Sequence, residues 1–171
     1  MKAALSRNAW ELALPGVVTG LGTGLVAGGL AAFSGQSPWL VILGFLGLGI
    51  PLAIFGAGYD GLLAAGKVRL AGVAPSVLYW IVMFPIARLI HQLTLGIAMG
   101  AGSRSIFPEG ILPFLAYHAV LGFGYGIGFL WVHEIFGGWW WPRIADHNPV
   151  ALGYVRRIMA SVDRKAKASR R

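Results

Sequence analysis

Four long apolar stretches follow one another along the chain, separated by short segments rich in glycine, proline, serine or charged residues. Each stretch has about 20 residues, the length that a helix needs to cross the hydrocarbon core of a bilayer. The first follows a short basic lead, as in a secretory signal peptide, but it is longer than the roughly 7–15 apolar residues of such a signal. The pattern therefore predicts four transmembrane helices, over residues 12–33, 38–58, 76–99 and 111–132.

Three consecutive tryptophans follow the last predicted span, and aromatic residues at this position are typical of the belt at a membrane–water interface. Asn148 and Pro149 then favour the start of a helix over residues 149–162. Its apolar residues lie opposite two arginines, which indicates an amphipathic helix on the membrane surface. The predicted interfacial anchors are Trp139, Trp140, Trp141, Arg156 and Arg157.

The predicted fold class is an all-α integral membrane protein, namely a four-transmembrane-helix bundle with a C-terminal interfacial amphipathic helix and a basic tail. Residues 1–142 form the membrane domain in this interpretation. Residues 143–171 form a cytoplasmic interfacial helix, followed by a disordered basic tail over residues 164–171.

Composition agrees with a membrane protein, because only 12% of the residues are charged, against roughly 25% in soluble domains. The chain has no cysteine, which excludes disulfides, thiolate metal sites and a cysteine nucleophile. The net charge is +8, and eight of the fourteen Lys and Arg residues lie at or after Arg143. We expect this tail to bind anionic lipid. Nucleic acid is not an expected partner, since no aromatic residues interleave with these charges.

Basic residues also predict the orientation. An even number of spans places both termini on one side of the membrane, together with the second loop and its Lys67 and Arg69. The other side has Arg104 alone. Because cytoplasmic loops carry the excess of Lys and Arg, we expect both termini to be cytoplasmic.

Glycines recur every fourth residue in the first span, and two more share a face of the fourth. Small residues on one stripe let helix backbones approach closely, which drives helix association in lipid. The stripe does not indicate whether its partner helix belongs to this chain or to another copy. The predicted packing glycines are Gly16, Gly20, Gly24, Gly28, Gly122 and Gly126.

The third span has Arg88, His91 and Gln92 on one helical face, although ionisable groups at membrane depth are costly and face protein or water. His118 and Tyr125 share a face of the fourth span, and His118 lies at nearly the same depth as His91. These five residues are predicted to form one buried polar patch in the outer half of the bilayer. A hydrogen-bond network that fixes helix packing is the first interpretation of this patch.

Two sharper interpretations remain open. His91 and His118 are possible axial ligands of a b-type haem, although packed helices lie only roughly 8–10 Å apart. No metal site is predicted from the histidines alone. Arg88 has no acidic residue of this chain at its own depth, and an intramembrane cation usually pairs. Its partner is then a backbone carbonyl, Tyr125, an anion, a lipid group or a carboxylate on another chain.

No sequence signature of a soluble enzyme is present, and we expect a non-enzymatic protein without a cofactor. The leading hypothesis is an accessory or structural subunit of a larger membrane complex, or a homo-oligomer, whose partners are the bilayer and other subunits or copies of itself. The alternatives are a small oligomeric transporter or channel for an anionic solute, and a redox subunit that binds haem or quinone.

Cysteine labelling tests the predicted orientation. A cysteine at Ser103 should react with an impermeant thiol reagent added to intact cells, whereas one at Ser169 should react only after lysis. The cysteine-free parent chain is the control. The reverse labelling pattern would reject the model with both termini inside.

Overall fold

The computed structural model describes the backbone of residues 2–168 and the side chains of residues 8–102 and 105–164, and this part of the chain contains helices and no strands. Four of the helices are long and apolar enough to cross a membrane, which supports a multi-pass membrane protein. The predicted basic tail lies partly outside the described residues, because residues 169–171 are not described. The helices are α1 (Lys2–Phe33), α2 (Pro38–Ala64), α3 (Val73–Ala98), α4 (Ser103–Ile106), α5 (Ile111–Ile144) and α6 (Pro149–Ala168).

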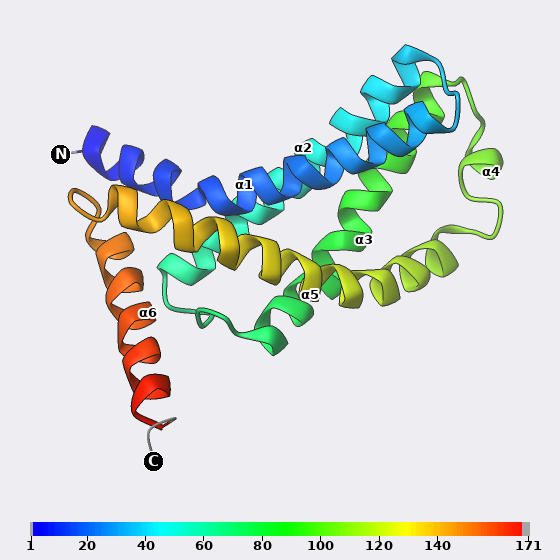
Figure 1. Ribbon diagram of the computed structural model, residues 1–171. Helices are drawn as coiled ribbons and strands as arrows, with labels where there is room; N and C mark the ends of the chain where they lie inside the picture. Colours follow the sequence, from blue (N-terminus) through cyan, green and yellow to red (C-terminus); the bar gives the residue numbers. More distant parts are fainter. Residues whose placement is uncertain (1, 169–171) are drawn as a thin grey trace.

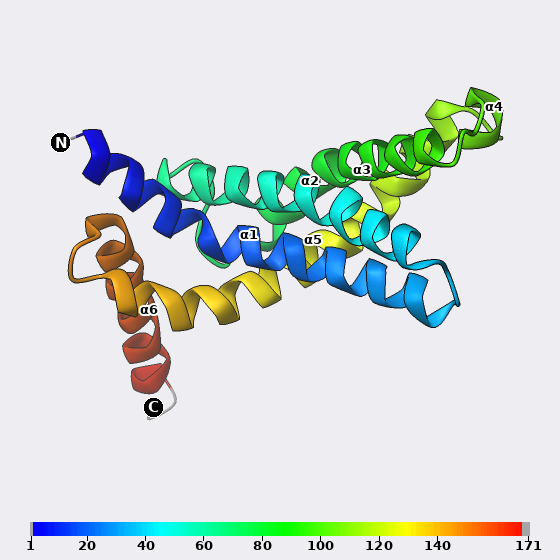
Figure 2. The same ribbon diagram turned by 90° about the horizontal axis from the view of Figure 1, so that it is seen from above.

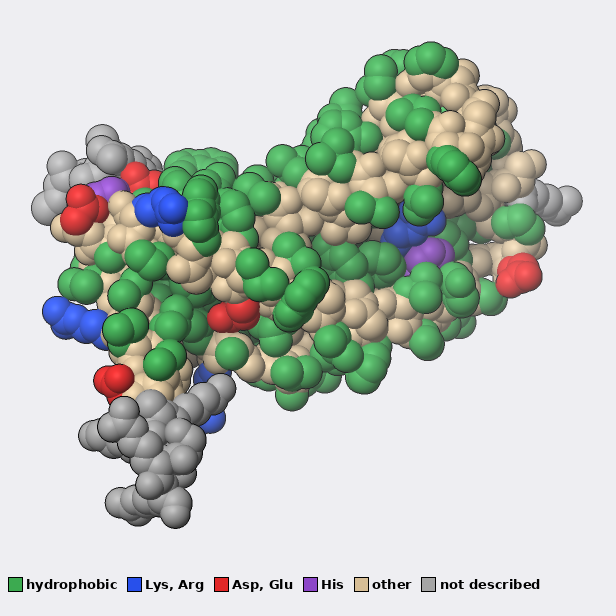
Figure 3. Space-filling model, in the orientation of Figure 1, with side chains coloured by type: hydrophobic (Ala, Val, Ile, Leu, Met, Phe, Trp, Pro, Cys, Tyr) green, Lys and Arg blue, Asp and Glu red, His purple; other side chains and the backbone are tan. Residues whose placement is uncertain are grey.

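Two helix pairs form the bundle (Figure 1). Helices α1 and α2 pack as an antiparallel hairpin, and α3 packs on α5. The start of α1, the end of α5 and α6 lie at one end of the molecule, whereas the α1–α2 turn and α4 lie at the other (Figures 1 and 2). Hydrophobic side chains cover much of the visible face between these ends (Figure 3).

Two helices run further than the sequence pattern predicted. The spans expected to end at residues 58 and 132 belong to helices that continue to Ala64 and Ile144. Asp60 and His133 lie just beyond these points, and ionisable groups favour the ends of membrane spans because they favour water. Asp60 and His133 instead bind each other inside the protein, so neither helix has to stop there. The C-terminal helix also continues to Ala168, so the start of the predicted disordered tail was wrong.

The structure places the glycine stripe of α1 directly on α2. A Cβ atom added to Gly20 would lie 2.6 Å from Cα of Ala53, and one added to Gly24 would lie 2.5 Å from Cα of Gly49. Gly16 faces Gly56, and Gly28 faces Phe45, in the same contact. The partner of this stripe is therefore a helix of the same chain.

A matching contact joins α5 to α3. A Cβ atom on Gly122 would lie 2.5 Å from the carbonyl oxygen of Trp80, and one on Gly126 would lie 2.9 Å from Cα of Val77. The Ser76 hydroxyl donates to the Gly126 carbonyl at 2.9 Å across this close approach. Glycine at these two positions lets α3 and α5 pack backbone to backbone.

The tryptophans expected at the membrane interface take three different positions at the end of α5. Trp139 is half exposed, with the Arg143 guanidinium 3.8 Å above its ring. Trp140 is half-buried. Trp141 is fully buried and packs against Tyr154 of α6, with ring centroids 5.0 Å apart. Trp141 is therefore a core residue that holds α6 on the bundle, whereas Arg156 and Arg157 on α6 are exposed.

Further contacts tie this corner to the start of α1. The Asn148 side chain donates to the Asn8 carbonyl at 3.0 Å. The exposed His147 ring lies 2.8 Å from Glu11 Oε2 and 2.6 Å from Asp146 Oδ1. The hydrogen bond to Glu11, which has the larger effect, and the one to Asp146 raise the pKa of His147. The α5–α6 corner is thereby fixed to the same end of α1.

Substitution of the α1 stripe tests this packing. Gly20→Ala should destabilise the protein by about 1–3 kcal/mol, because its methyl group would collide with the backbone of α2. Gly29→Ala is the matched control, since nothing lies within 4 Å of its added Cβ atom and alanine favours helix. Thermal unfolding in detergent gives the comparison. Equal melting temperatures for the two variants would contradict the close α1–α2 contact.

Candidate functional site

Arg88 and His91 of the predicted polar patch are bonded to each other. Arg88 Nη1 lies 2.5 Å from His91 Nδ1. A guanidinium can only donate, so Nδ1 of His91 accepts and the neutral ring carries its hydrogen on Nε2. His91 is 6% exposed, and its Nε2 has no hydrogen-bond partner among the described residues. This part of the patch therefore has a cation and an unused N–H donor.

The other three residues of the predicted patch bond elsewhere. The Gln92 amide donates to the Ile106 carbonyl of α4 at 3.2 Å. His118 Nδ1 donates to the Phe114 carbonyl of its own helix at 2.8 Å. The Tyr125 hydroxyl lies 3.3 Å from Thr23 Oγ1 on α1. The structure thus brings only Arg88 and His91 into a shared hydrogen bond.

The two histidines proposed as haem ligands differ in their surroundings. His118 is packed among aromatic rings, with the centroid of Phe114 at 4.1 Å and that of Tyr117 at 5.2 Å. His91 lies against α2, where a Cβ atom on Gly47 would be 3.1 Å from its ring. Haem binding stays a prediction. Residues 8–102 and 105–164 contain no group of three or more His, Asp or Glu that could hold a metal ion.

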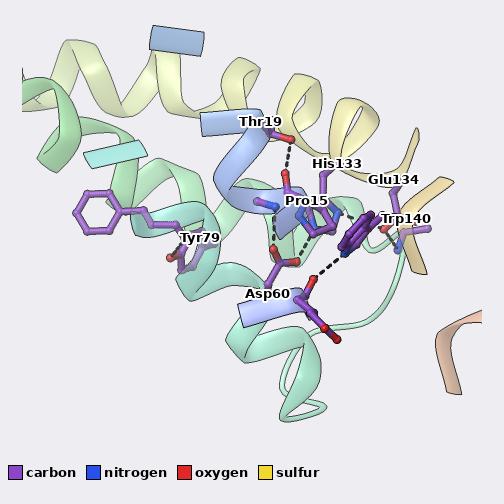
Figure 4. Close-up of polar contacts among 11 residues, drawn as sticks. Pro15, Thr19, Asp60, Tyr79, His133, Glu134 and Trp140 are labelled. Carbon is purple, nitrogen blue, oxygen red and sulfur yellow. Dashed lines mark hydrogen bonds and ion pairs between the residues drawn. The ribbon is translucent and has the colours of Figure 1, made fainter. Parts of the chain in front are cut away.

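A second polar centre lies among α1, α2 and α5, where the sequence interpretation placed none (Figure 4). His133 of α5 donates from Nε2 to Asp60 Oδ1 of α2 at 2.6 Å. The other carboxylate oxygen, Oδ2, accepts the backbone N–H of Gly16 in α1 at 2.8 Å. Asp60 is 3% exposed and His133 is fully buried. One carboxylate therefore joins three of the four long helices.

Proline explains why α1 presents polar backbone groups at this point. Pro15 has no N–H and cannot bond the carbonyl of Glu11, one helical turn earlier. Trp140 of α5 donates its indole N–H to that carbonyl at 2.8 Å instead. The Thr19 hydroxyl donates to the Pro15 carbonyl at 2.8 Å (Figure 4). Side chains thus bond the polar backbone groups around this interrupted turn of α1. Two of these side chains come from other helices, namely Asp60 of α2 and Trp140 of α5.

Glycine lets Asp60 come this close to α1. A Cβ atom on Gly16 would lie 2.6 Å from Asp60 Oδ2, and the backbone of Gly56 is in contact as well. Aromatic rings of Tyr59, Phe129 and Trp141 surround His133, with centroids 5.3–5.8 Å from its own. The pair is thereby shielded from water, which strengthens the electrostatic attraction between its members.

Glu134 extends this centre toward the surface. Its Oε1 lies 3.9 Å from His133 Nδ1 and accepts the backbone N–H of Ala71 at 3.1 Å. Ala71 has a positive φ of 55° in the loop between α2 and α3, a conformation that is uncommon for residues other than glycine. Glu134 therefore holds this loop in place beside α5.

The sequence interpretation missed this centre for an identifiable reason. Asp60 follows one long apolar run, and His133 with Glu134 follows another, a pattern that favours positions at the membrane boundary. Each residue alone looks like a helix end. The available signal was the combination of Pro15 inside an apolar span with Gly16 beside it and an acidic residue at the end of the next span.

Comparison of the chain with protein-family models, with curated proteins and with solved structures finds no match.

Removing one member of the buried pair should cost much more than removing an exposed carboxylate. Asp60→Leu leaves His133 and the Gly16 N–H without their acceptor, and we expect a loss of about 3–5 kcal/mol of stability. Asp146→Asn, at an exposed position, should change stability by no more than about 0.5 kcal/mol. Unfolding in detergent measures both.

The double variant Asp60→Leu/His133→Phe separates pairing from packing. Replacing both members of a buried pair with apolar residues is often neutral. The double variant should therefore recover much of the stability lost in Asp60→Leu. Parent-like melting of Asp60→Leu alone would show that the pair does not join the helices.

Proposed function

We propose that this chain is a non-enzymatic multi-pass membrane protein that serves as a subunit of a larger membrane assembly, in which Arg88 binds an acidic group of the partner. Arg88 carries the proposal because its charge has no counterion among the described residues. Its recorded partner, His91, accepts a hydrogen bond as a neutral ring and supplies no negative charge.

The two acidic residues of the buried centre among α1, α2 and α5 bond other groups. Asp60 binds His133 and Gly16, and Glu134 holds Ala71. Among the side chains described, those of residues 8–102 and 105–164, no carboxylate forms an ion pair with Arg88. A buried guanidinium without a counterion costs several kcal/mol, at least about 2.5 even on insertion scales. A carboxylate from a second chain would offset that cost.

Position also supports a contact with a partner. Arg88 lies near the middle of α3, a candidate membrane span, and is half-buried, so a group from outside the chain can reach it. Basic and histidine side chains are visible together in a hollow on the right-hand half of Figure 3, over the part of the molecule that α3 crosses. Apolar residues beside Arg88 on α3, among them Ile86 and Ile90, are exposed and suit a helix from another subunit.

A small oligomeric transporter for an anionic solute is the second candidate. The Nε2–H of His91 is buried and has no acceptor in the described part of the chain, beside a cation that also only donates. A cation beside a free N–H donor would suit a permeant anion as well as a fixed carboxylate.

Charge substitution at Arg88 tests both candidates. Arg88→Gln keeps hydrogen-bond donors but removes the charge. If Arg88 binds a partner, this variant should lose the co-purifying partner, and if Arg88 binds a permeant anion, the rate of anion uptake into liposomes should fall at least about tenfold. Its melting temperature should stay close to that of the parent in both cases. Arg88→Lys should restore the function only in part, because a point charge replaces a planar fork. Arg156→Gln, on exposed α6, is the control for loss of one positive charge.

The result that counts against the proposal is a Gln variant that retains its partner and any anion uptake. Arg88 would then be a packing residue satisfied within its own chain.

A further inference from the structure

A cavity of about 690 Å³ opens at the end of the bundle where α2 ends and α3 begins. The loop between these helices forms one wall, α5 forms the second and α6 forms the third. Segments far apart in the sequence therefore meet around one space. Its polar lining side chains are Arg69, Glu134, Arg157, Ser161 and Arg164.

The cavity has more positive charge than the protein itself neutralises. Three arginines line it against one carboxylate. That carboxylate, Glu134, is directed to the Ala71 N–H and toward His133. Arg164 uses its Nε to bond the Ala160 carbonyl at 3.1 Å, and no ion pair of the three arginines is recorded among the described side chains. Guanidinium N–H groups are thus available to a ligand.

The loop that supplies Arg69 is held in a fixed position. Glu134 bonds Ala71, two residues after Arg69, and Val68 packs on the core cluster of Leu12, Leu63 and Trp141. Tyr154 of α6 belongs to the same cluster and Ile158 packs against it, so the helix that supplies Arg157 is fixed to the same core. The backbone segments that carry Arg69 and Arg157 are therefore brought together before any ligand binds, which reduces the entropic cost of binding.

The chemistry of the lining points to a phosphate ligand. Guanidinium groups match phosphate oxygens in pairs, and the Ser161 hydroxyl adds a donor. Val68, Leu70 and Ile158 make the remainder of the wall apolar. Basic pockets beside membrane helices bind the head groups of anionic lipids. We propose that this arginine cavity is a binding site for a phosphate-bearing anion, supplied either by the head group of an anionic phospholipid or by a soluble phosphate.

This proposal is separate from the function proposed for Arg88, which lies on the far half of α3. It also differs from a general attraction of the basic tail to anionic lipid, because Arg69 belongs to a loop 88 residues before Arg157 and only the fold brings the two together.

The experiment uses the full chain purified in a non-ionic detergent and native mass spectrometry with three probes. These are phosphatidylglycerol, phosphatidylcholine and inorganic phosphate. We expect saturable binding of phosphatidylglycerol in preference to phosphatidylcholine if the source is lipid, and of inorganic phosphate if the source is soluble. Saturable binding of neither anion would overturn the proposal.

Single substitutions then locate the site. Arg69→Gln and Arg157→Gln should each weaken binding about tenfold or more, as expected for the loss of a charged hydrogen bond. Arg157→Lys should weaken it less than Arg157→Gln. Arg156→Gln is the matched control, because it is the exposed neighbour of Arg157 and does not line the cavity. A loss in Arg156→Gln equal to that in Arg157→Gln would mean diffuse surface attraction, and the cavity would then not be the site.

Discussion

The hydrogen bonds of Asp60 hold the arrangement of the long helices. One carboxylate on α2 accepts from the backbone of α1 through Gly16 and from the side chain of α5 through His133, both within 2.8 Å. A shift of α1 or α5 against α2 would break one of these hydrogen bonds. Such a shift is unfavourable because a buried carboxylate without hydrogen-bond partners destabilises the fold. Van der Waals packing of apolar helices in lipid fixes their register only weakly, and one such polar contact can specify it.

Glycine and proline make this contact possible. Because Pro15 has no N–H, the Glu11 carbonyl accepts the indole N–H of Trp140 instead. Gly16 and Gly56 remove the side chains that would separate α1 from α2. A proline, two glycines and a carboxylate therefore act together in this junction. Glu134, the neighbour of His133 in α5, bonds the loop that carries Arg69 and lines the arginine cavity.

The sequence predicts the four long helices well, because a long run of apolar residues is a local signal for a helix that lies out of water. It also indicates which faces of α1 and α5 pack closely, through Gly20, Gly24 and Gly122. It does not reveal the Asp60–His133 pair, since the two residues are 73 positions apart and each alone favours water. The predicted polar patch divides for a similar reason, because Gln92 and Tyr125 find partners on α4 and α1 that depend on helix rotation.

The most direct test of the Asp60 junction is solid-state NMR of the protein in bilayers, with ¹³C in the aspartate carboxyl groups and ¹⁵N in the histidine rings. An Asp146→Asn background removes the second close pair, Asp146 and His147. The structure predicts a detectable ¹³C–¹⁵N dipolar coupling between Asp60 and His133, because their N–O distance is 2.6 Å. Absence of that coupling, with the protein folded, would contradict the account.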